Sequence, residues 1–204
     1  YDEILKSALD DNEVESITSW INQKRNSILV NINRISFDEL KLWSFVNGEL
    51  EHKTGKFFKI QGLNVKTNYG EIHDWDQPII NQDEVGYLGF IMKKVDGILK
   101  FLVQAKVEPG NINNVQLSPT IQATKSNYSQ VHEGRVPYYL EYFQNVKKKN
   151  ILVDQLHSEQ GSRFLMKRNR NIIIYVEENI KLFDDFKWIS LGELNKFLQL
   201  DNIV

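Results

Sequence analysis

The chain has 204 residues, 41% of them hydrophobic, which is enough for one globular domain with a core of its own. Its 25 basic and 27 acidic residues leave a net charge of −2, so we expect no broad surface for nucleic acid. The absence of cysteine excludes disulfides, thiol catalysis, Cys-ligated zinc and iron–sulfur clusters, and no apolar run approaches the roughly 20 residues of a membrane span. Since no signal peptide is visible either, we expect a cytoplasmic protein without a membrane partner.

Two helices are predicted at the start of the chain. Apolar residues recur at helical spacing over 3–9 and 14–21, and the polar residues 10–12 between them can cap the second helix. Residues 1–25 are therefore predicted to be a helical lead-in. No later stretch has the composition of a linker, so the whole chain, 1–204, is predicted to form one domain.

Three weaker signals follow the lead-in. Alternating apolar and polar residues predict a half-buried strand over 28–33. A capping-box pattern at 36–39 predicts a short helix that ends at Trp43. Residues 56–66 have the composition of a strand, with an interruption at 61–62.

The strongest local signal is a β-hairpin in the middle of the chain. Two β-prone runs, 86–95 and 98–107, are joined by the dipeptide Asp-Gly, which is typical of a two-residue hairpin turn. Residues 115–124 predict a further strand. Pro119 inside that run indicates an edge position or a bulge.

Helices and strands continue to the C-terminus. Pro137 suits the first turn of a helix that runs to about residue 146. A second capping box at 190–193 predicts a last helix that ends near residue 200. Strands are expected between these helices, over 151–156, 163–166 and 171–176. Helices that flank a strand-rich middle indicate an α+β class, here an α/β/α sandwich with a mixed sheet.

Two of the expected strands carry polar residues of an unusual kind. If the strands over 99–108 and 115–126 are neighbours, their side chains share one concave surface: Gln104, Lys106, Glu108, Gln116, Ser118, Thr120 and Gln122. A row of Gln, Ser and Thr side chains on one face of a sheet suits a pocket that binds the hydroxyl and carbonyl groups of a sugar. The alternative is an ordinary solvated sheet face, although such a face is usually rich in Lys and Glu.

Loops beside this surface supply further candidates. Asn111 follows a stiff Pro-Gly turn, and Asn127, Tyr128 and His132 extend the polar surface beyond the second strand. Tyr128 and His132 can act as acid or base, although either residue can instead be structural.

Two other clusters can contact a nucleotide. Trp75 lies near Gln77 in a polar stretch, where a Trp ring can stack on a base or sugar or can pack in the core. Lys167, Arg168 and Arg170 form a basic cluster between two expected strands. This cluster can bind a diphosphate, or it can be a solvated turn.

No P-loop, Rossmann, zinc-protease, hydrolase-elbow or EF-hand motif is present. Instead, several segments together resemble the NDP-hexose 2,3-dehydratase family of deoxysugar biosynthesis. The most specific is QAK-EPGN at 104–111, followed by QLSPT-QAT-SNY at 116–128. The other similar stretches cover nearly the whole chain: 43–45, 55–58, 75–80, 86–89, 101–103, 139–143, 158–162, 164–165, 167–171, 188, 191–193 and 201–202, with His132 and Gly134.

The resemblance implies a Nudix-like fold without a Nudix metal site, because no R-E-x-x-E-E box is present. An ordinary Nudix hydrolase is therefore disfavoured. Family members are typically about twice this length and contain tandem copies, and this chain is similar to the first copy. The exposed face of a lone copy suggests a homodimer.

The activity that the resemblance implies is loss of water across C2–C3 of a nucleotide-linked 4-keto-6-deoxyhexose, with dTDP-4-keto-6-deoxyglucose as the expected substrate. A base removes the acidic C3 proton, and the C2 hydroxyl leaves with help from an acid. No cofactor is chemically required, and a 3-ketoreductase would consume the product. Glu108 or His132 is the expected base and Tyr128 the expected donor, with Lys106 and the basic cluster on the diphosphate. The alternative function is a non-catalytic sugar-nucleotide-binding domain, or a half-enzyme that needs a partner copy.

Overall fold

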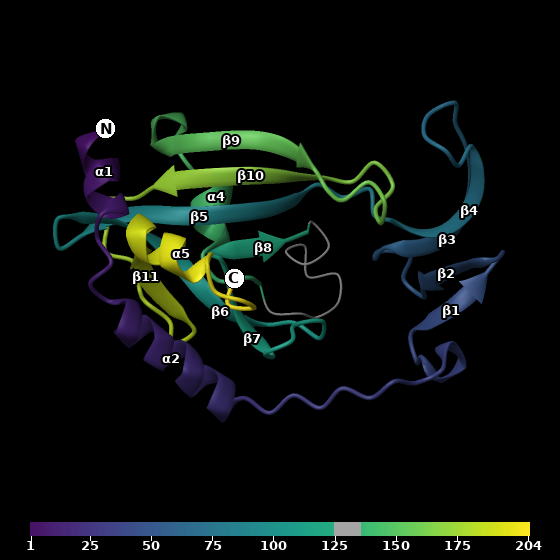
Figure 1. Cartoon of the computed structure of the whole chain (residues 1–204), viewed down its shortest axis with the longest axis horizontal. Helices are drawn as coiled ribbons and strands as arrows, with labels where there is room; N and C mark the ends of the chain where they lie inside the picture. The colour runs from purple at the N-terminus through teal and green to yellow at the C-terminus, as the bar shows by residue number, and fades with distance from the viewer. Residues whose placement is uncertain (125–135) are drawn as a thin grey trace.

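The computed structural model describes residues 1–124 and 136–204, which form two sheets and a few short helices (Figure 1). A four-stranded antiparallel sheet has the order β1-β2-β3-β4, and a seven-stranded sheet has the order β11-β6-β5-β10-β9, with β7 paired to β6 and β8 to β5. The strands of the smaller sheet are β1 (Trp43–Val46), β2 (Glu49–His52), β3 (Lys59–Lys66) and β4 (Asp74–Asn81). Those of the larger are β5 (Gly86–Val95), β6 (Ile98–Val107), β7 (Val115–Pro119), β8 (Ile121–Ala123), β9 (Ile151–Ser158), β10 (Arg168–Tyr175) and β11 (Phe186–Ser190).

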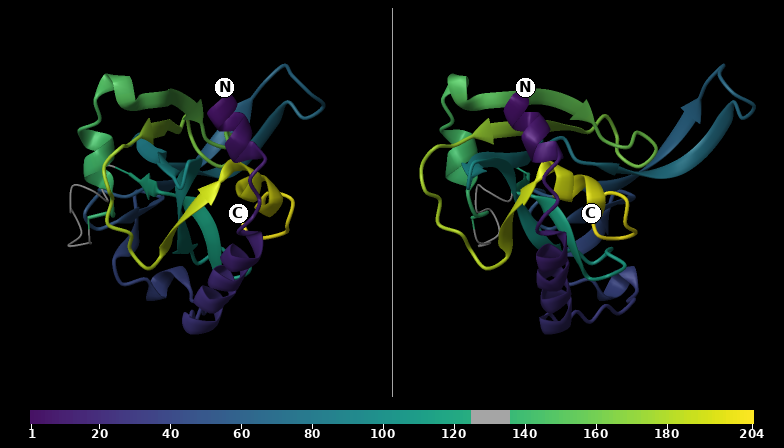
Figure 2. Two further views of the ribbon diagram at one scale, coloured as in Figure 1. Left: turned by 90° about the vertical axis from the view of Figure 1, so that its left-hand side faces the viewer. Right: turned by 60° about the vertical axis from the view of Figure 1, so that its left-hand side comes forward.

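Helices cover both faces of the larger sheet, as Figure 2 shows. Helix α4 (Leu140–Gln144) buries Phe143 against Ile91, Leu102 and Ile172 on one face. On the other face, α2 (Val14–Ser27) and α5 (Leu191–Phe197) pack over two further apolar clusters, and α1 (Asp2–Ala8) lies against β6 and α5. Because β10 runs parallel to β5 and antiparallel to β9, the sheet is mixed. The predicted α+β class and the layered arrangement are confirmed.

The predicted hairpin between β5 and β6 is confirmed. Its turn residues, Asp96 and Gly97, have φ of 49° and 80°, the positive values that a type I′ turn requires. The two strands pair with each other only near this turn, from Met92–Phe101 to Val95–Ile98. Beyond that point they diverge: β5 pairs with β8, and β6 pairs with β7. This divergence, which we call the fork, creates the space in which a candidate site lies.

Several predicted elements are wrong in type or extent. Residues 28–33 form no strand but an extended run between α2 and β1, because no strand within residues 1–124 and 136–204 pairs with it, and Leu29 is 93% exposed. The capping box at 36–39 forms, but it opens only a 3₁₀ turn, Phe37–Glu39, and Trp43 begins β1. Residues 163–166 make a single bridge, between Phe164 and Ile80, in place of the predicted strand.

Smaller differences concern where elements begin and end. Strand β3 begins at Lys59 and has no interruption, and the predicted strand over 115–124 is broken in two at Thr120. Helix α4 begins only after Tyr139, whose φ is 63°, and α5 ends at Phe197. Both lead-in helices form as predicted, and within the described residues no helix is long and apolar enough for a membrane span.

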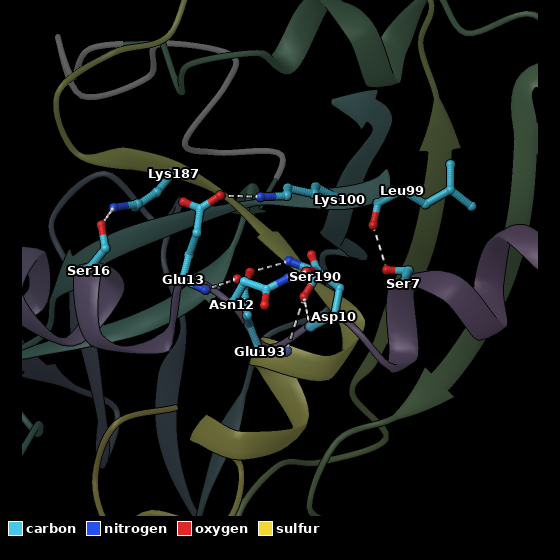
Figure 3. Close-up of polar contacts among 10 residues, drawn as sticks. All are labelled: Ser7, Asp10, Asn12, Glu13, Ser16, Leu99, Lys100, Lys187, Ser190 and Glu193. Carbon is cyan, nitrogen blue, oxygen red and sulfur yellow. Dashed lines mark hydrogen bonds and ion pairs between the residues drawn. The ribbon is translucent and has the colours of Figure 1, made fainter. Parts of the chain in front are cut away.

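A buried polar network fastens the helical lead-in to α5 (Figure 3). The fully buried Glu193 carboxylate accepts the backbone N–H of Ser190 at 2.8 Å and that of Glu13 at 2.9 Å. Lys100 donates to the Glu13 carboxylate at 2.6 Å. A side chain at Gly192 would place its Cβ 2.4 Å from the Asp10 carbonyl oxygen. The start of α5 and the lead-in can therefore approach this closely only because residue 192 is glycine.

We expect Glu193→Ala to lower the free energy of unfolding by about 2–4 kcal/mol, because the buried Ser190 N–H and the part-buried Glu13 N–H lose their acceptor. The matched control is Glu39→Ala, since Glu39 makes the same capping-box bond to Ser36 at 2.7 Å but on the exposed surface. The control should cost less than about 1 kcal/mol. Urea unfolding of both variants checks this, and equal losses would contradict the role given to the buried network.

Candidate functional site

A polar cavity of about 370 Å³ lies within the fork. We call it the fork pocket. Its lining residues come from β5, β6, β8, the start of β10 and the loops that precede β5 and β10, and include Tyr87, Lys106, Glu108, Gln122, Glu159, Lys167 and Asn169. The predicted adjacency of the two polar strands is confirmed, because Gln104 pairs with Ser118 and Lys106 with Gln116.

Lys106 is the central polar contact of the fork pocket. Its ammonium lies 2.7 Å from the Glu108 carboxylate and donates to the Gln122 amide oxygen at 2.9 Å. Since Gln122 belongs to β8, this side chain links the two arms of the fork. The ion pair leaves this wall close to neutral, with one carboxylate and one amide available to hydroxyl groups of a ligand.

A second cavity of about 780 Å³ lies between the smaller sheet and the loop before β10. We call it the aromatic pocket. The residues that line it include Leu63, Val65, Trp75, Gln77, Ile79, Ser162, Leu165 and Arg168. Trp75 donates its indole N–H to the Gln77 amide oxygen at 2.9 Å, and Gln77 donates to the Ser162 carbonyl at 3.0 Å. Gln77 therefore fixes the indole of Trp75 relative to the loop.

The two pockets share a wall made of Glu159, Phe164 and Lys167. Lys167 is 5% exposed and donates to the Glu84 carbonyl oxygen. Burial lowers the pKa of its ammonium, and the nearby charges of Glu84 and Glu159 partly offset that effect. On the same wall, the Asn169 amide donates to the Glu159 carboxylate. A buried cation thus lies where a ligand spanning both pockets would pass.

Some predicted site residues lie elsewhere. Thr120 is 2% exposed and its hydroxyl is used inside the sheet, so it does not line the polar surface as predicted. Asn111 donates to the carbonyls of Lys106 and Asn114 within its own loop. Gln104, Gln116 and Ser118 lie on the strands of the fork, but none of them lines either pocket.

Arg170 is the clearest correction within the basic cluster. It lies inside β10, not in a turn, and binds Asp154 through two hydrogen bonds of 2.7 and 2.6 Å. These bonds lower the pKa of the Asp154 carboxyl and raise that of the guanidinium. The guanidinium also donates to the Tyr87 hydroxyl at 3.3 Å. Arg170 therefore braces Tyr87 at the edge of the fork pocket and lines neither cavity itself.

Three predicted residues, Asn127, Tyr128 and His132, lie outside the described residues. Conversely, the polar residues Tyr87, Glu159 and Asn169 are among those that line the fork pocket without having been candidates. Each belongs to a stretch on which the family resemblance depends, and that was the available signal. Across residues 1–124 and 136–204, no three His, Asp or Glu side chains gather as a metal site would require.

Comparisons with known proteins decide the family. The model of the NDP-hexose 2,3-dehydratase family matches residues 14–204. The chain belongs to this family. It is 49% identical over 187 residues to the dTDP-4-dehydro-6-deoxy-alpha-D-glucopyranose 2,3-dehydratase of Saccharopolyspora spinosa, a match that covers 91% of this chain and 38% of the relative.

Two further relatives of this chain are also dTDP-4-dehydro-6-deoxy-alpha-D-glucopyranose 2,3-dehydratases. The one from Amycolatopsis orientalis is 43% identical over 197 residues, covering 93% of this chain and 42% of the relative. The one from Streptomyces violaceoruber is 39% identical over 189 residues, covering 91% and 43%. The chain thus spans about two-fifths of the length of the curated relatives it matches.

Solved structures offer only weak likenesses. A C. elegans Ap4A hydrolase aligns with 57% of this chain and 87% of its own at 15% identity and a TM-score of 0.33. The apo T. brucei MERS1 protein aligns with 58% and 62% at 12% identity and a TM-score of 0.37. Likenesses at this level support no conclusion about the site, and the Nudix-like detail of the fold remains a prediction.

We expect Thr120→Val to lower the free energy of unfolding by about 2–4 kcal/mol, because the Leu102 carbonyl and the Ile91 N–H lose their shared partner at the fork. Ser118→Ala is the control, since the Ser118 hydroxyl reaches only the adjacent Pro119 carbonyl, at 3.3 Å. Denaturant unfolding of both variants checks this. Equal stability of the Val variant and the parent would show that the hydroxyl does not hold the fork.

Proposed function

We propose that this chain binds a nucleotide-linked 4-keto-6-deoxyhexose and eliminates water across C2–C3, with dTDP-4-keto-6-deoxyglucose as the substrate. The observation that supports this most is the pairing of a polar, sugar-sized pocket with a larger aromatic pocket across a shared wall that contains a buried lysine. The names of the three curated relatives, dTDP-4-dehydro-6-deoxy-alpha-D-glucopyranose 2,3-dehydratases, support the same substrate.

The lining of the two pockets suggests how such a ligand would be placed. The sugar would occupy the fork pocket, where Glu108, Gln122 and Asn169 can hydrogen-bond hydroxyl and carbonyl groups. The thymine base of the nucleotide would occupy the aromatic pocket against Trp75. The diphosphate would then lie at the shared wall, close to Lys167 and to the exposed Arg168.

The elimination needs one base and one acid, and its atoms balance without a further reactant. A base takes the C3 proton, which the C4 ketone makes acidic, and an enolate forms between C3 and C4. The C2 hydroxyl then leaves as water once an acid has protonated it. The resulting C2=C3 enol takes up a proton at C2 and becomes a 3,4-diketone. A 3-ketoreductase acting on this diketone is the proposed next partner.

Glu108 is the base that the described residues support best, because it lines the fork pocket and its carboxylate is fixed by Lys106 at 2.7 Å. Lys106 can also offset the repulsion between this carboxylate and a forming enolate. His132 as an alternative base and Tyr128 as the donor remain predictions from the sequence. A cytoplasmic location and a homodimeric state are likewise part of the proposal.

The nucleotide end of the proposal has a direct binding test. We expect Arg168→Ala to weaken dTDP binding by about 10- to 150-fold, the loss of about 1.5–3 kcal/mol that accompanies removal of a charge-assisted hydrogen bond. Arg163→Ala is the matched control, because Arg163 is an exposed neighbour that lines neither pocket. Titration calorimetry of both variants checks this, and unchanged affinity in the Arg168 variant would exclude a diphosphate at this wall.

The chemical end is tested by following deuterium from solvent into C3 of dTDP-4-keto-6-deoxyglucose. Glu108→Ala should exchange at least about 10²-fold more slowly than the parent if Glu108 is the base. Glu71→Ala, an exposed glutamate in the β3–β4 loop, should exchange at the parent rate. If Glu108→Ala and His132→Ala both bind dTDP and exchange at the parent rate, neither residue is the base.

The same experiment separates the alternative function. A non-catalytic binding domain, or a half-enzyme that needs a further copy, would bind dTDP normally but would exchange no deuterium at C3 in the parent protein. This alternative follows from the match to only about two-fifths of each curated relative. Adding a 3-ketoreductase with NADPH and seeking a 2-deoxy product gives an independent readout of the complete elimination.

A further inference from the structure

Met166 combines a strained backbone with an exposed apolar side chain. It lies in the loop before β10, and its φ is 49°, the left-handed region that L-residues other than asparagine and aspartate rarely adopt. Its side chain is long and apolar, yet the residue is 90% exposed. Figure 1 shows this loop at the end of β9 and β10 nearest the smaller sheet. Burial in the core therefore does not offset the backbone strain.

The other non-glycine residues with positive φ have an evident structural reason. Four of them are the side chains that tolerate this conformation best: Asn47, Asp96, Asn114 and Asn202. The fifth, Tyr139, is 2% exposed, and its hydroxyl donates to the Lys181 carbonyl at 2.9 Å and accepts the Phe183 N–H at 3.3 Å. Among residues 1–124 and 136–204, Met166 alone has positive φ with neither a tolerant side chain nor a buried one.

Hydrogen bonds on both sides fix the backbone at Met166. The Leu165 N–H donates to the Ile80 carbonyl at 2.9 Å, and the Lys167 carbonyl accepts the Glu159 N–H at 2.9 Å. The chain must therefore turn sharply at residue 166, between one residue bonded to the smaller sheet and another in the shared wall of the pockets. Strain that neighbouring contacts impose in this way is typical of a ligand-binding position.

The ligand side of this turn is the aromatic pocket, which Met166 lines from the loop and Trp75 lines from β4. Gln77 accepts the indole N–H and donates to the Ser162 carbonyl of the same loop, so the two walls are joined. A planar group in this pocket would meet a fixed indole on the sheet wall and a flexible thioether on the loop wall. Thioethers adapt their shape readily and make favourable contacts with aromatic rings.

We propose that Met166 is a nucleotide-binding residue whose thioether covers the base in the aromatic pocket. The identity of the ligand rests on the proposed function, whereas the role of Met166 rests on its backbone, its exposure and its place in the pocket wall. Binding of the base would bury a side chain that is exposed in the free protein. The favourable contact in the complex would then account for the strained conformation in the free chain.

Oxidation by hydrogen peroxide tests the contact directly, because the chain has two methionines and Met92 is only 5% exposed. Peroxide converts an accessible thioether to the sulfoxide, and peptide mapping by mass spectrometry follows each methionine separately. We expect saturating dTDP to slow the oxidation of Met166 by at least about fivefold, since the base covers the sulfur. Inorganic pyrophosphate, which has no base, should leave the rate unchanged. Equal rates with and without saturating dTDP would overturn the proposal.

Met166→Asn separates binding from folding. Asparagine tolerates the left-handed backbone, so the free energy of unfolding should be equal to or higher than that of the parent. The dTDP affinity should nevertheless fall by about 3- to 10-fold, because the contact between sulfur and base is lost. Leu29→Asn is the matched control, since Leu29 is equally exposed but lines neither pocket, and its affinity should equal that of the parent. A Met166→Asn variant with parental affinity would overturn the proposal.

Failure of this role can be distinguished from failure of the proposed function. If the parent protein does not bind dTDP in calorimetry, the proposed function is wrong and the role of Met166 is wrong with it. If the parent binds dTDP while Met166 stays unprotected, or while Met166→Asn binds with parental affinity, only the role of Met166 is wrong.

Discussion

The hydroxyl of Thr120 holds the sheet together where β5 and β6 separate. It accepts the Ile91 N–H at 2.9 Å and donates to the Leu102 carbonyl, so one buried side chain bonds to both diverging strands. An unpaired N–H and an unpaired carbonyl at this depth would each cost about 1–3 kcal/mol. The fork pocket exists because β5 and β6 can separate at this point without leaving those groups unsatisfied. Beyond it, β5 pairs with β8 and β6 pairs with β7.

At the opposite end of the same sheet, a buried network of charged side chains holds the lead-in helices against α5. Glu193 binds the backbone of two segments about 180 residues apart in sequence, and Lys100 completes the network through Glu13. A buried carboxylate is stable only when such donors surround it. This network holds the lead-in helices over one face while α4 covers the other, which leaves the fork as the region where polar side chains remain accessible. The buried network and the fork pocket thus lie at different ends of the sheet.

Local patterns allowed much of the fold to be predicted from the sequence. The Asp-Gly turn determined the β5–β6 hairpin, and alternation along 104–108 correctly placed Lys106 and Glu108 on one wall. The placement of Thr120 on the polar surface was wrong. The apolar–polar alternation continues through this residue in the sequence, whereas the strand breaks there and its hydroxyl turns into the sheet. The placement of Arg170 in a basic turn was wrong because its partner, Asp154, lies on a neighbouring strand, and no local sequence pattern connects the two residues. The aromatic pocket likewise depends on the contact between Ile80 and Phe164, which is long-range.

Lys167 is the residue of the shared wall on which the proposed diphosphate site depends most. Burial lowers the pKa of its ammonium, which means that the fold disfavours the charge it encloses. Its ammonium donates to the Glu84 carbonyl, and the nearby charges of Glu84 and Glu159 offset part of the cost of burial. Under the proposed function, a diphosphate that reaches both pockets would add further negative charge at this wall. The unfavourable burial in the free protein would then become a favourable interaction in the complex, which is the energetic pattern of a preorganised anion site.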